Sequence, residues 1–322
     1  MSFNREDYKN VKESFDTRRK KAVEEAEERK AQVCAGVPEM KNICAGLEAT
    51  GPKVYYAALE GKQDYEKRLS NIKYETETLL KRQKELLLAN GYPEDYLDIK
   101  YRCPLCRDEG NINGKMCSCM RAELVKAGYE SAGIAGLCDK MSFDTFDLSY
   151  YTGEDRRNME LILQKVKEYA ESFCGVGSGS MLFIGGTGLG KTHLSVAVIK
   201  RVTERGYYCV YTTSDKLFAD FREERFRSAD DKSPSKTAKY SECELLVIDD
   251  LGTELNGRDI VPFLYSLLNQ RINSGASTVI STNLSHRELL DVYDERIVSR
   301  LFGEFLPYKF SGKDVRMQKL KN

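Results

Sequence analysis

The sequence has no long apolar run and only two histidines. No stretch approaches the roughly 20 apolar residues that a membrane-spanning helix needs. Residues 1–21 are too charged to contain the apolar core of a signal peptide. We therefore expect a cytoplasmic protein with no membrane partner, whose ten cysteines stay reduced. His193 and His286 have no metal or acid–base partners that the sequence suggests, and we interpret both as structural.

The sequence also lacks an excess of charge of either sign, with 50 Lys and Arg against 50 Asp and Glu. This balance excludes a chain-wide attraction to nucleic acid, so any such contact must come from a local patch. A length of 322 residues is sufficient for two domains. We place the boundary near residue 135, which gives a helical, cysteine-bearing domain over residues 1–135 and a second domain over residues 136–322.

One stretch joins a short apolar segment to a glycine-rich loop and then to an apolar helical pattern. Strand, loop and helix in this order are the setting of a phosphate-binding P-loop, G-x-x-x-x-G-K-[ST]. Glycines let the backbone N–H groups converge on an anion, and the helix adds its positive N-terminal end. The lysine supplies charge for the β- and γ-phosphates, and the threonine hydroxyl supplies a ligand for Mg²⁺. The alternative is a glycine-rich turn that binds nothing. The predicted nucleotide-binding residues are Gly185, Gly186, Thr187, Gly188, Leu189, Gly190, Lys191 and Thr192.

A second apolar segment, residues 245–248, runs directly into Asp249 and Asp250. Ligands of parallel sheets bind beyond the carboxyl ends of the strands, so we predict that Asp249 reaches the Mg²⁺ shell opposite Thr192. Asp250 is the predicted base that orients the attacking water. Glutamate is usual at this place, and the shorter aspartate suggests slow turnover. The alternative is an ordinary strand end capped by two carboxylates.

A third apolar segment, residues 277–282, ends in Asn283. Beside the two aspartates, this side chain is predicted to bond the γ-phosphate or the attacking water, although an asparagine at a strand end is commonly only a turn former. Strands that alternate with helices in this way predict a doubly wound parallel α/β sheet.

Arg296 and Arg300 lie four residues apart, on one face of a predicted helix. A salt-bridged surface helix is the default interpretation. In a ring-forming ATPase, however, such an arginine reaches the γ-phosphate of the neighbouring subunit and stabilises charge in the transition state. Arg300 is the first candidate for this role and Arg296 the second. Arg316, near the C-terminus, is the candidate phosphate sensor within the same chain.

Four of the ten cysteines are grouped as two pairs around Asn113-Gly114, a strong signal for a tight hairpin. Two pairs at the ends of a hairpin can place four thiolates tetrahedrally around Zn²⁺, in a structural site that stiffens a small module. The second pair is C-x-C and not C-x-x-C, which leaves Cys138 or a partner chain as an alternative source of one ligand. Free thiols are the other alternative. The predicted zinc ligands are Cys103, Cys106, Cys117 and Cys119.

Helical patterns over residues 4–35, 39–47 and 62–90 precede the cysteines, with a break predicted at Gly51-Pro52. Their apolar faces are thin, which is more typical of a docking module than of an enzyme core. A plain solvated helical hairpin is the alternative.

Together these motifs resemble the AAA+ core of the bacterial DnaC/DnaI replicative helicase loaders, a clade that also includes the IstB transposition ATPases. The likeness covers about residues 140–320, and Asp249-Asp-Leu-Gly-Thr-Glu254 is its most specific phrase. Residues 91–97 and 101–119 are similar to the zinc-bearing N-terminal region of the DnaI-type loaders. IstB proteins generally lack that region, so its presence favours a loader.

The resemblance implies an ATPase that binds the hexameric DnaB-type replicative helicase and delivers it onto single-stranded DNA. Residues 1–135 would contact the helicase, and the AAA+ domains would self-assemble through the ATP site. ATP would lie between the P-loop of one subunit and Arg300 of the next, with slow hydrolysis that assembly or single-stranded DNA stimulates.

The resemblance also implies that Phe143 and Phe146 lie near the adenine. The helix over residues 259–273 is a candidate DNA contact by its position, with Arg271 as its single basic residue. Two other functions stay open. One is an IstB-like ATPase that recruits a transposase to target DNA, and the other is an adaptor in which the nucleotide is structural.

Overall fold

The computed structural model describes residues 3–59, 64–226, 235–252 and 261–320. The chain divides into two compact units, Lys12–Cys119 and Met120–Asn322 together with Met1–Val11. The domain boundary near residue 135 stays a prediction, because compactness alone does not show which segment folds by itself. Among the described residues, no helix has both the length and the apolar character that crossing a bilayer requires.

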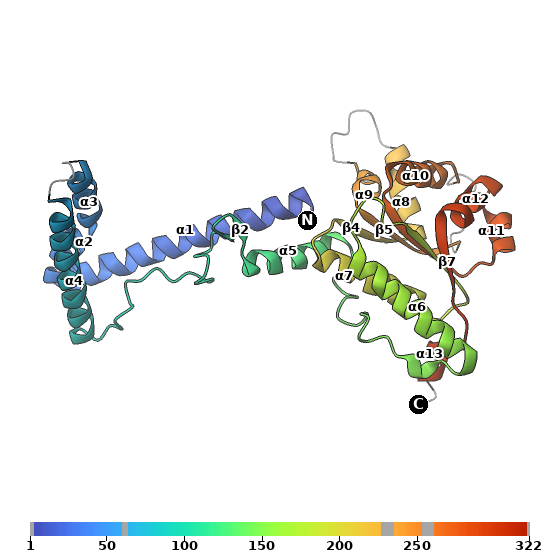
Figure 1. Ribbon diagram of the computed structural model, residues 1–322, viewed down its shortest axis with the longest axis horizontal. Helices are drawn as coiled ribbons and strands as arrows, with labels where there is room; N and C mark the ends of the chain where they lie inside the picture. Colours follow the sequence, from blue (N-terminus) through green and yellow to red (C-terminus); the bar gives the residue numbers. More distant parts are fainter. Residues whose placement is uncertain (1–2, 60–63, 227–234, 253–260, 321–322) are drawn as a thin grey trace. The chain divides into compact units, whose positions relative to one another are not determined.

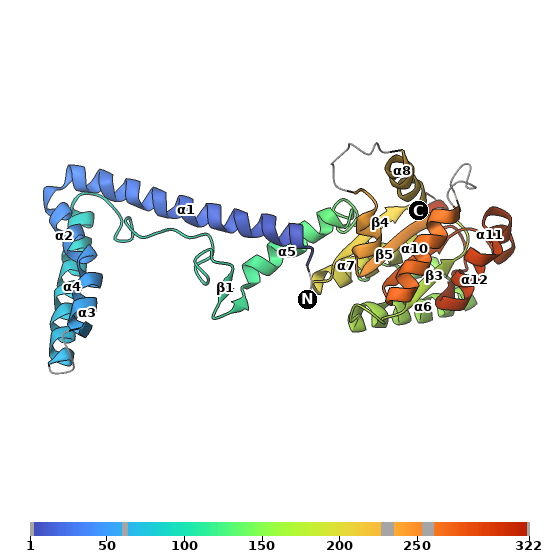
Figure 2. The ribbon, with the colours of Figure 1, turned by 90° about the horizontal axis from the view of Figure 1, so that it is seen from above.

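Helices dominate the first part of the chain (Figures 1 and 2). Helices α2, α3 and α4 pack against one another, and a small apolar cluster of Val33, Met40, Cys44 and Leu87 joins α1, α2 and α4. The elements are α1 (Arg5–Gly36), α2 (Pro38–Glu48), α3 (Thr50–Leu59), α4 (Tyr65–Ala89), β1 (Asn111–Ile112), β2 (Lys115–Met116) and α5 (Ser118–Ser131).

The predicted break is present but lies at Ala49, between α2 and α3, whereas Gly51 and Pro52 lie in the first turn of α3. Proline is tolerated there, since the first N–H groups of a helix have no intrahelical partner. The hairpin prediction is confirmed: β1 and β2 are antiparallel, and Asn113 and Gly114 both have positive φ, at 50° and 76°. The predicted helix start at Lys62 lies outside the described residues, and α4 is described from Tyr65.

A five-stranded parallel sheet in the order β4-β5-β6-β3-β7 organises the second unit. The predicted doubly wound parallel α/β class is therefore confirmed. The strands are β3 (Ser180–Ile184), β4 (Cys209–Thr213), β5 (Leu245–Leu251), β6 (Ser277–Thr282) and β7 (Phe305–Lys309). The helices are η1 (Leu148–Tyr150), α6 (Gly153–Ser172), α7 (Lys191–Glu204), α8 (Ser214–Arg225), α9 (Ala238–Glu242), α10 (Val261–Ser274), α11 (His286–Val292), α12 (Glu295–Glu304) and α13 (Val315–Lys319).

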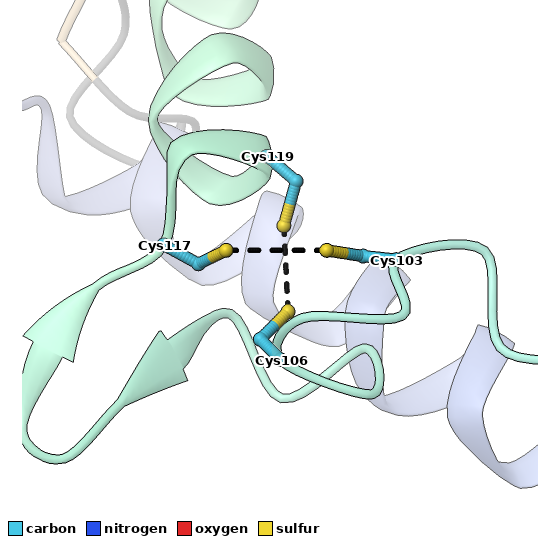
Figure 3. Close-up of side chains that lie close together, drawn as sticks. All are labelled: Cys103, Cys106, Cys117 and Cys119. Atoms are coloured by element: carbon cyan, nitrogen blue, oxygen red, sulfur yellow. Dashed lines mark hydrogen bonds between the residues drawn. The ribbon is translucent and has the colours of Figure 1, made fainter.

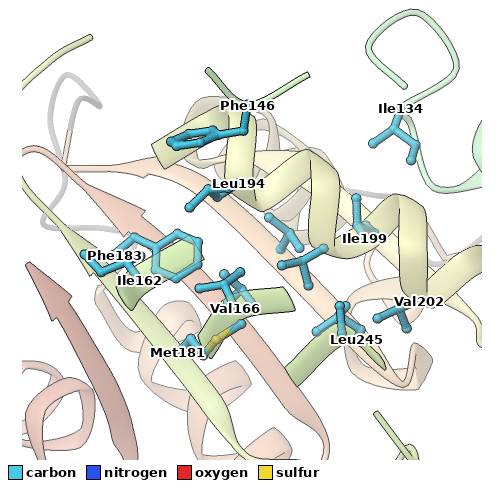
Figure 4. Close-up of a cluster of buried hydrophobic side chains, with 14 of the residues drawn as sticks. Ile134, Phe146, Ile162, Val166, Met181, Phe183, Leu194, Ile199, Val202 and Leu245 are labelled. Atoms are coloured by element: carbon cyan, nitrogen blue, oxygen red, sulfur yellow. The ribbon is translucent and has the colours of Figure 1, made fainter. Parts of the chain in front are cut away.

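Each face of the sheet is covered by its own helices. On one face, α6 and α7 pack their apolar sides onto β3, as Figure 4 shows for Ile162, Val166 and Leu194 around Met181 and Phe183. Helices α8 to α12 cover the opposite face with a second apolar cluster. Alternate residues of β3 therefore enter different cores, and each fully buried large apolar side chain contributes about 1.5–3 kcal/mol. Because β3 packs into both cores, the strand that leads into the glycine loop is held rigidly.

Strand β7 is not predicted from the sequence, because Pro307 interrupts its apolar pattern. Pro307 pairs in parallel register with Leu182 of β3. Proline is tolerated in β7 because this is an edge strand, on which one side of the backbone needs no ladder partner.

Candidate functional site

The glycine loop connects β3 to α7 as the sequence predicts, and two of its glycines are required by shape. Gly188 and Gly190 have φ values of 71° and 84°, in the left-handed region. A Cβ atom on Gly188 would lie 2.0 Å from Oδ1 of Asp314, and one on Gly190 would lie 2.7 Å from Cε2 of Phe146. Any larger residue would therefore be both strained and in collision. The loop keeps its backbone exposed to the space in front of α7.

Lys191 is the first residue of α7, and its side chain is only 4% exposed. Its Nζ donates hydrogen bonds to the carbonyl oxygens of Gly185 and Gly186, both at 2.7 Å, and to Oδ1 of Asn283 at 2.5 Å. Burial lowers the pKa of Lys191, and the charges of Asp250 and Asp249 oppose that shift. The predicted P-loop lysine and the predicted sensor asparagine are thus in direct contact.

The two predicted acids lie where β5 ends. Asp249 is 2% exposed, and its Oδ2 accepts a hydrogen bond from the Tyr211 hydroxyl at 2.9 Å. Asp250 has a left-handed φ of 55°, and its Oδ1 lies 3.5 Å from Nδ2 of Asn283. Burial raises the pKa of Asp250, and the neighbouring Asp249 raises it further. A raised pKa makes this carboxylate a better proton acceptor, as a general base requires.

A cavity of about 270 Å³ lies over the loop and contains most of the predicted residues. Asp249 and the first two loop glycines are not among its lining residues, although Asp249 directly precedes Asp250, which is. The predicted residues that line it are Thr187, Gly188, Leu189, Gly190, Lys191, Thr192, Asp250, Asn283 and Arg316. The lining residues that were not predicted to bind nucleotide include Met141, Thr145, Asp147, Tyr150, Tyr151, His193, Val315 and Lys319.

The segment before η1 forms one wall of this cavity. Phe146 lines the cavity, whereas Phe143 packs beside the core and is not among its lining residues. The ring of His193 meets Phe146 edge-on at 5.2 Å, and its Nε2 lies 2.8 Å from the carbonyl oxygen of Ser142. His193 therefore positions the wall, which agrees with a structural role. Burial lowers the pKa of His193, so the neutral ring is favoured.

Tyr151 is a cavity residue that sequence reasoning missed. Its hydroxyl donates to the carbonyl oxygen of Leu189 in the glycine loop at 3.0 Å. Its ring stacks near that of Phe146, with 6.0 Å between the centroids. No spacing or motif in the sequence indicates this contact, because it joins residues 38 positions apart across an irregular segment.

The C-terminal helix α13 brings Arg316 to the same cavity. The backbone N–H of Val315 donates to the carbonyl oxygen of Gly188 at 2.9 Å, and Asp314 caps the helix by accepting from the N–H of Arg316 at 2.7 Å. Burial is the main cause of the lowered pKa of Lys191 and of the raised pKa of Asp250. The Arg316 guanidinium lies close enough to lower the pKa of both groups. This position suits the predicted sensor within the same chain.

Arg296 and Arg300 lie elsewhere, on α12. Arg296 bonds Asp294 at 2.8 Å and lies over the Tyr265 ring, and Arg300 lies 3.6 Å from Glu304. Both arginines border a separate hollow beside Tyr265 and are absent from the described lining of the glycine-loop cavity. Within one chain, therefore, Arg300 does not reach the candidate nucleotide site.

Thr213 caps α8, and the hydroxyl of the next residue, Ser214, donates to the Asp250 carbonyl oxygen at 2.9 Å. Arg271 has a different role from the one that its position suggests. Arg271, the basic residue of α10, is fully buried and bonds Thr278 Oγ1 at 2.9 Å. It cannot supply a contact to DNA. Residues 259 and 260, the first two of the expected helix, lie outside the described residues. So do Thr253 and Glu254, the last two residues of the motif that begins at Asp249.

Figure 3 shows the four predicted cysteines pointing toward one centre. All four Sγ atoms lie within 4.8 Å of one another, with Cys103 and Cys117 at 3.9 Å and Cys106 and Cys119 at 3.4 Å. Zinc–sulfur bonds of 2.3 Å in a tetrahedron require Sγ atoms about 3.8 Å apart, so the cluster is compatible with zinc. Cys138 is not part of it, because this thiol is buried in the core of the other unit.

Asp108 supports the loop that carries Cys103 and Cys106. This residue is buried, and its backbone has a left-handed φ of 55°. Its two oxygens accept the backbone N–H groups of Arg102 and Cys103, both at 2.9 Å. The loop therefore has an internal support that orients Cys103 toward the centre.

Comparison with known proteins places the region around the glycine loop in a family. The family model of the IstB-like ATP binding protein matches residues 130–302, more than half of the chain. The replicative helicase loader DnaC of Escherichia coli K12 is 26% identical over 181 residues, which are 56% of this chain and 71% of DnaC. The uncharacterized protein YqaM of Bacillus subtilis 168 is 25% identical over 210 residues, 63% of this chain and 65% of YqaM.

Among solved structures, the DnaC helicase loader aligns with a TM-score of 0.46 at 22% identity, over 54% of this chain and 98% of that one. The DnaI crystal structure aligns with a TM-score of 0.43 at 20% identity, over 55% of this chain and 91% of that one. Given the strand–loop–helix geometry, the buried lysine and the family match, the chain belongs to the IstB-like ATP-binding protein family of AAA+ proteins and is a distant relative of the DnaC helicase loaders.

Proposed function

We propose that this protein is an ATP-dependent loader that binds the hexameric DnaB-type replicative helicase and delivers it onto single-stranded DNA. The observation that carries the proposal is the presence of two different sites in one chain. One unit holds a cavity around Lys191, and the other holds a four-thiol cluster. The relationship to DnaC, a protein named as a replicative helicase loader, supports this function and makes the helicase the expected partner.

At the cavity, the loop N–H groups and Lys191 bind the phosphates, and Thr192 and Asp249 hold Mg²⁺. When bound, Mg²⁺ neutralises charge on the phosphates. Asp250 accepts a proton from the attacking water, and Asn283 orients that water or the γ-phosphate. Arg316 contacts the phosphates from the side of α13. Hydrolysis is expected to be slow, since aspartate is shorter than the usual glutamate at this position.

At the cluster, Cys103, Cys106, Cys117 and Cys119 hold a structural zinc ion. The hairpin β1-β2 lies between the second and third of these cysteines and contributes few apolar contacts of its own, with both strands exposed. A metal would therefore supply the stability that the hairpin lacks. In this proposal the region that zinc stabilises, together with α1 to α4, contacts the helicase.

An IstB-like ATPase that recruits a transposase is the second candidate, and the family match over residues 130–302 favours it. The four-thiol cluster argues against it, since the IstB proteins generally lack such a module. A transposase gene beside the gene for this protein would support this second function.

The loader function is tested by measuring mass in solution with light scattering. The full chain is mixed with the replicative helicase of the same genome, with and without ATP. We expect a complex whose mass or stability changes with the nucleotide. A helicase from a distant bacterium serves as the control for nonspecific association. If no complex forms under any nucleotide condition, the loader function is wrong.

Arg300→Ala is expected to lower ATP hydrolysis about 100-fold or more while ATP binding stays within about twofold, because a guanidinium from the neighbouring subunit acts mainly on the transition state. Arg287→Ala, at an exposed arginine of the adjacent helix α11, is the matched control. Mixing Arg300→Ala with Lys191→Ala subunits is expected to restore part of the rate, since one interface of the mixture has both intact groups. Unchanged hydrolysis in Arg300→Ala would refute the assignment.

A further inference from the structure

Strand β5 contains an irregularity at the candidate site. Ile248 pairs with Ile280 of β6, and the next registered pair is Leu251 with Thr282. Two residues of β5, Asp249 and Asp250, therefore lie opposite one residue of β6, Ser281. This two-against-one arrangement is a β-bulge, and it gives Asp250 its left-handed φ of 55°.

Ser281 supplies a hydrogen-bond acceptor for a backbone N–H group that the bulge leaves without a partner in the sheet. Its Oγ accepts the N–H of Asp250 at 2.9 Å. The same hydroxyl donates its hydrogen to Oδ1 of Asp249. These two roles fix the direction of the bonds, because a backbone N–H can only donate and a carboxylate can only accept. Ser281 is fully buried, so water does not compete for either bond.

Tyr211 holds the second oxygen of the same carboxylate. It lies on β4, next to β5, and its hydroxyl donates to Oδ2 of Asp249 at 2.9 Å. A phenol can donate its hydrogen and a carboxylate can only accept, so the direction of this bond is fixed as well. Each oxygen of Asp249 thus has one hydroxyl donor, and a carboxylate has about four lone-pair sites in all. Each oxygen of Asp249 therefore keeps an acceptor position that neither hydroxyl occupies.

We propose that Ser281 and Tyr211 are positioning residues that hold the Asp249 carboxylate at one orientation for Mg²⁺, with Ser281 also fixing the backbone of Asp250. The proposal rests on the proposed role of Asp249 in holding Mg²⁺. Neither residue touches the nucleotide in this proposal, and neither is among the described residues that line the cavity. Their effect is to set the affinity for Mg²⁺ rather than the affinity for ATP itself.

The test measures binding of a fluorescent ATP analogue by the full chain, first in EDTA and then across a Mg²⁺ titration. Groups that orient a metal ligand typically change metal affinity by 10–100-fold. Ser281→Ala and Tyr211→Phe are therefore each expected to raise the half-saturating Mg²⁺ concentration about tenfold. Affinity for the analogue in EDTA is expected to stay within about twofold, because the glycine loop and Lys191 are unchanged.

Ser195→Ala is the matched control, since it removes the same atoms from a fully buried serine of α7 whose hydroxyl has no partner within the described structure. Tyr211→Phe removes a single oxygen and preserves ring packing, so it carries the test if Ser281→Ala does not fold. The native chain must first show binding that depends on Mg²⁺. The inference is then overturned if Tyr211→Phe has the same half-saturating Mg²⁺ concentration as Ser195→Ala, and Ser281→Ala, where it folds, does too. A native chain that binds no ATP analogue at any Mg²⁺ concentration would instead refute the proposed nucleotide site.

Discussion

Replacing Lys191 with alanine is expected to slow ATP hydrolysis by about 100-fold or more, which is the usual effect of removing one preorganised charge from a transition state. The ammonium group is buried and held by three oxygen atoms, of Gly185, Gly186 and Asn283. The rate is measured by phosphate release under saturating Mg²⁺ and ATP.

The same substitution separates a loss of binding from a loss of folding. Because burial lowers the pKa of Lys191, its charged form is disfavoured in the folded state, and alanine is expected to leave the melting temperature unchanged or higher. ATP at 100 times its Kd stabilises a native protein by about 2.7 kcal/mol, and the variant is expected to lose that increment. Lys165→Ala, at an exposed lysine of α6 paired with Glu168, is the control and should keep it. Native-like hydrolysis in Lys191→Ala would exclude this loop as the catalytic site.

Purified protein is expected to contain about one zinc ion per chain, and Cys106→Ser is expected to lose it. Structural zinc sites of this kind contribute an apparent 10–16 kcal/mol at neutral pH, far more than the exposed hairpin β1-β2 can supply. We expect residues 100–119 of the variant to become sensitive to limited proteolysis. We also expect the variant to lose helicase binding. ATP binding should persist, because the glycine-loop cavity belongs to the other unit.

Elemental analysis of the metal content checks this expectation. Cys174→Ser is the matched control, since Cys174 is exposed and lies outside the four-thiol cluster, and it should retain the metal. A native protein without stoichiometric zinc, or a Cys106→Ser variant that keeps it, would show that the cluster is a set of free thiols.

Local patterns in the sequence were sufficient for the parts of the molecule that depend on neighbouring residues. The strand, glycine loop and helix around Lys191 follow from an apolar run, the backbone freedom of glycine and helical periodicity. The hairpin follows from Asn113-Gly114, because both residues adopt positive φ readily. The four zinc candidates follow from their spacing. In each case the interacting residues are close in sequence, and the backbone preference of a few residues decides the result.

Contacts between distant segments depended on the order of the strands, which local patterns do not encode. That order places β5 between β4 and β6, and so brings Tyr211 and Ser281 onto the Asp249 carboxylate. Burial likewise removes Arg271 from any contact with DNA and keeps Cys138 out of the four-thiol cluster. The sequence by itself thus determined which groups could bind phosphate and metal. Only the tertiary structure decided which side chains orient them, because hydrogen bonds form between atoms that packing brings together, whatever their separation along the chain.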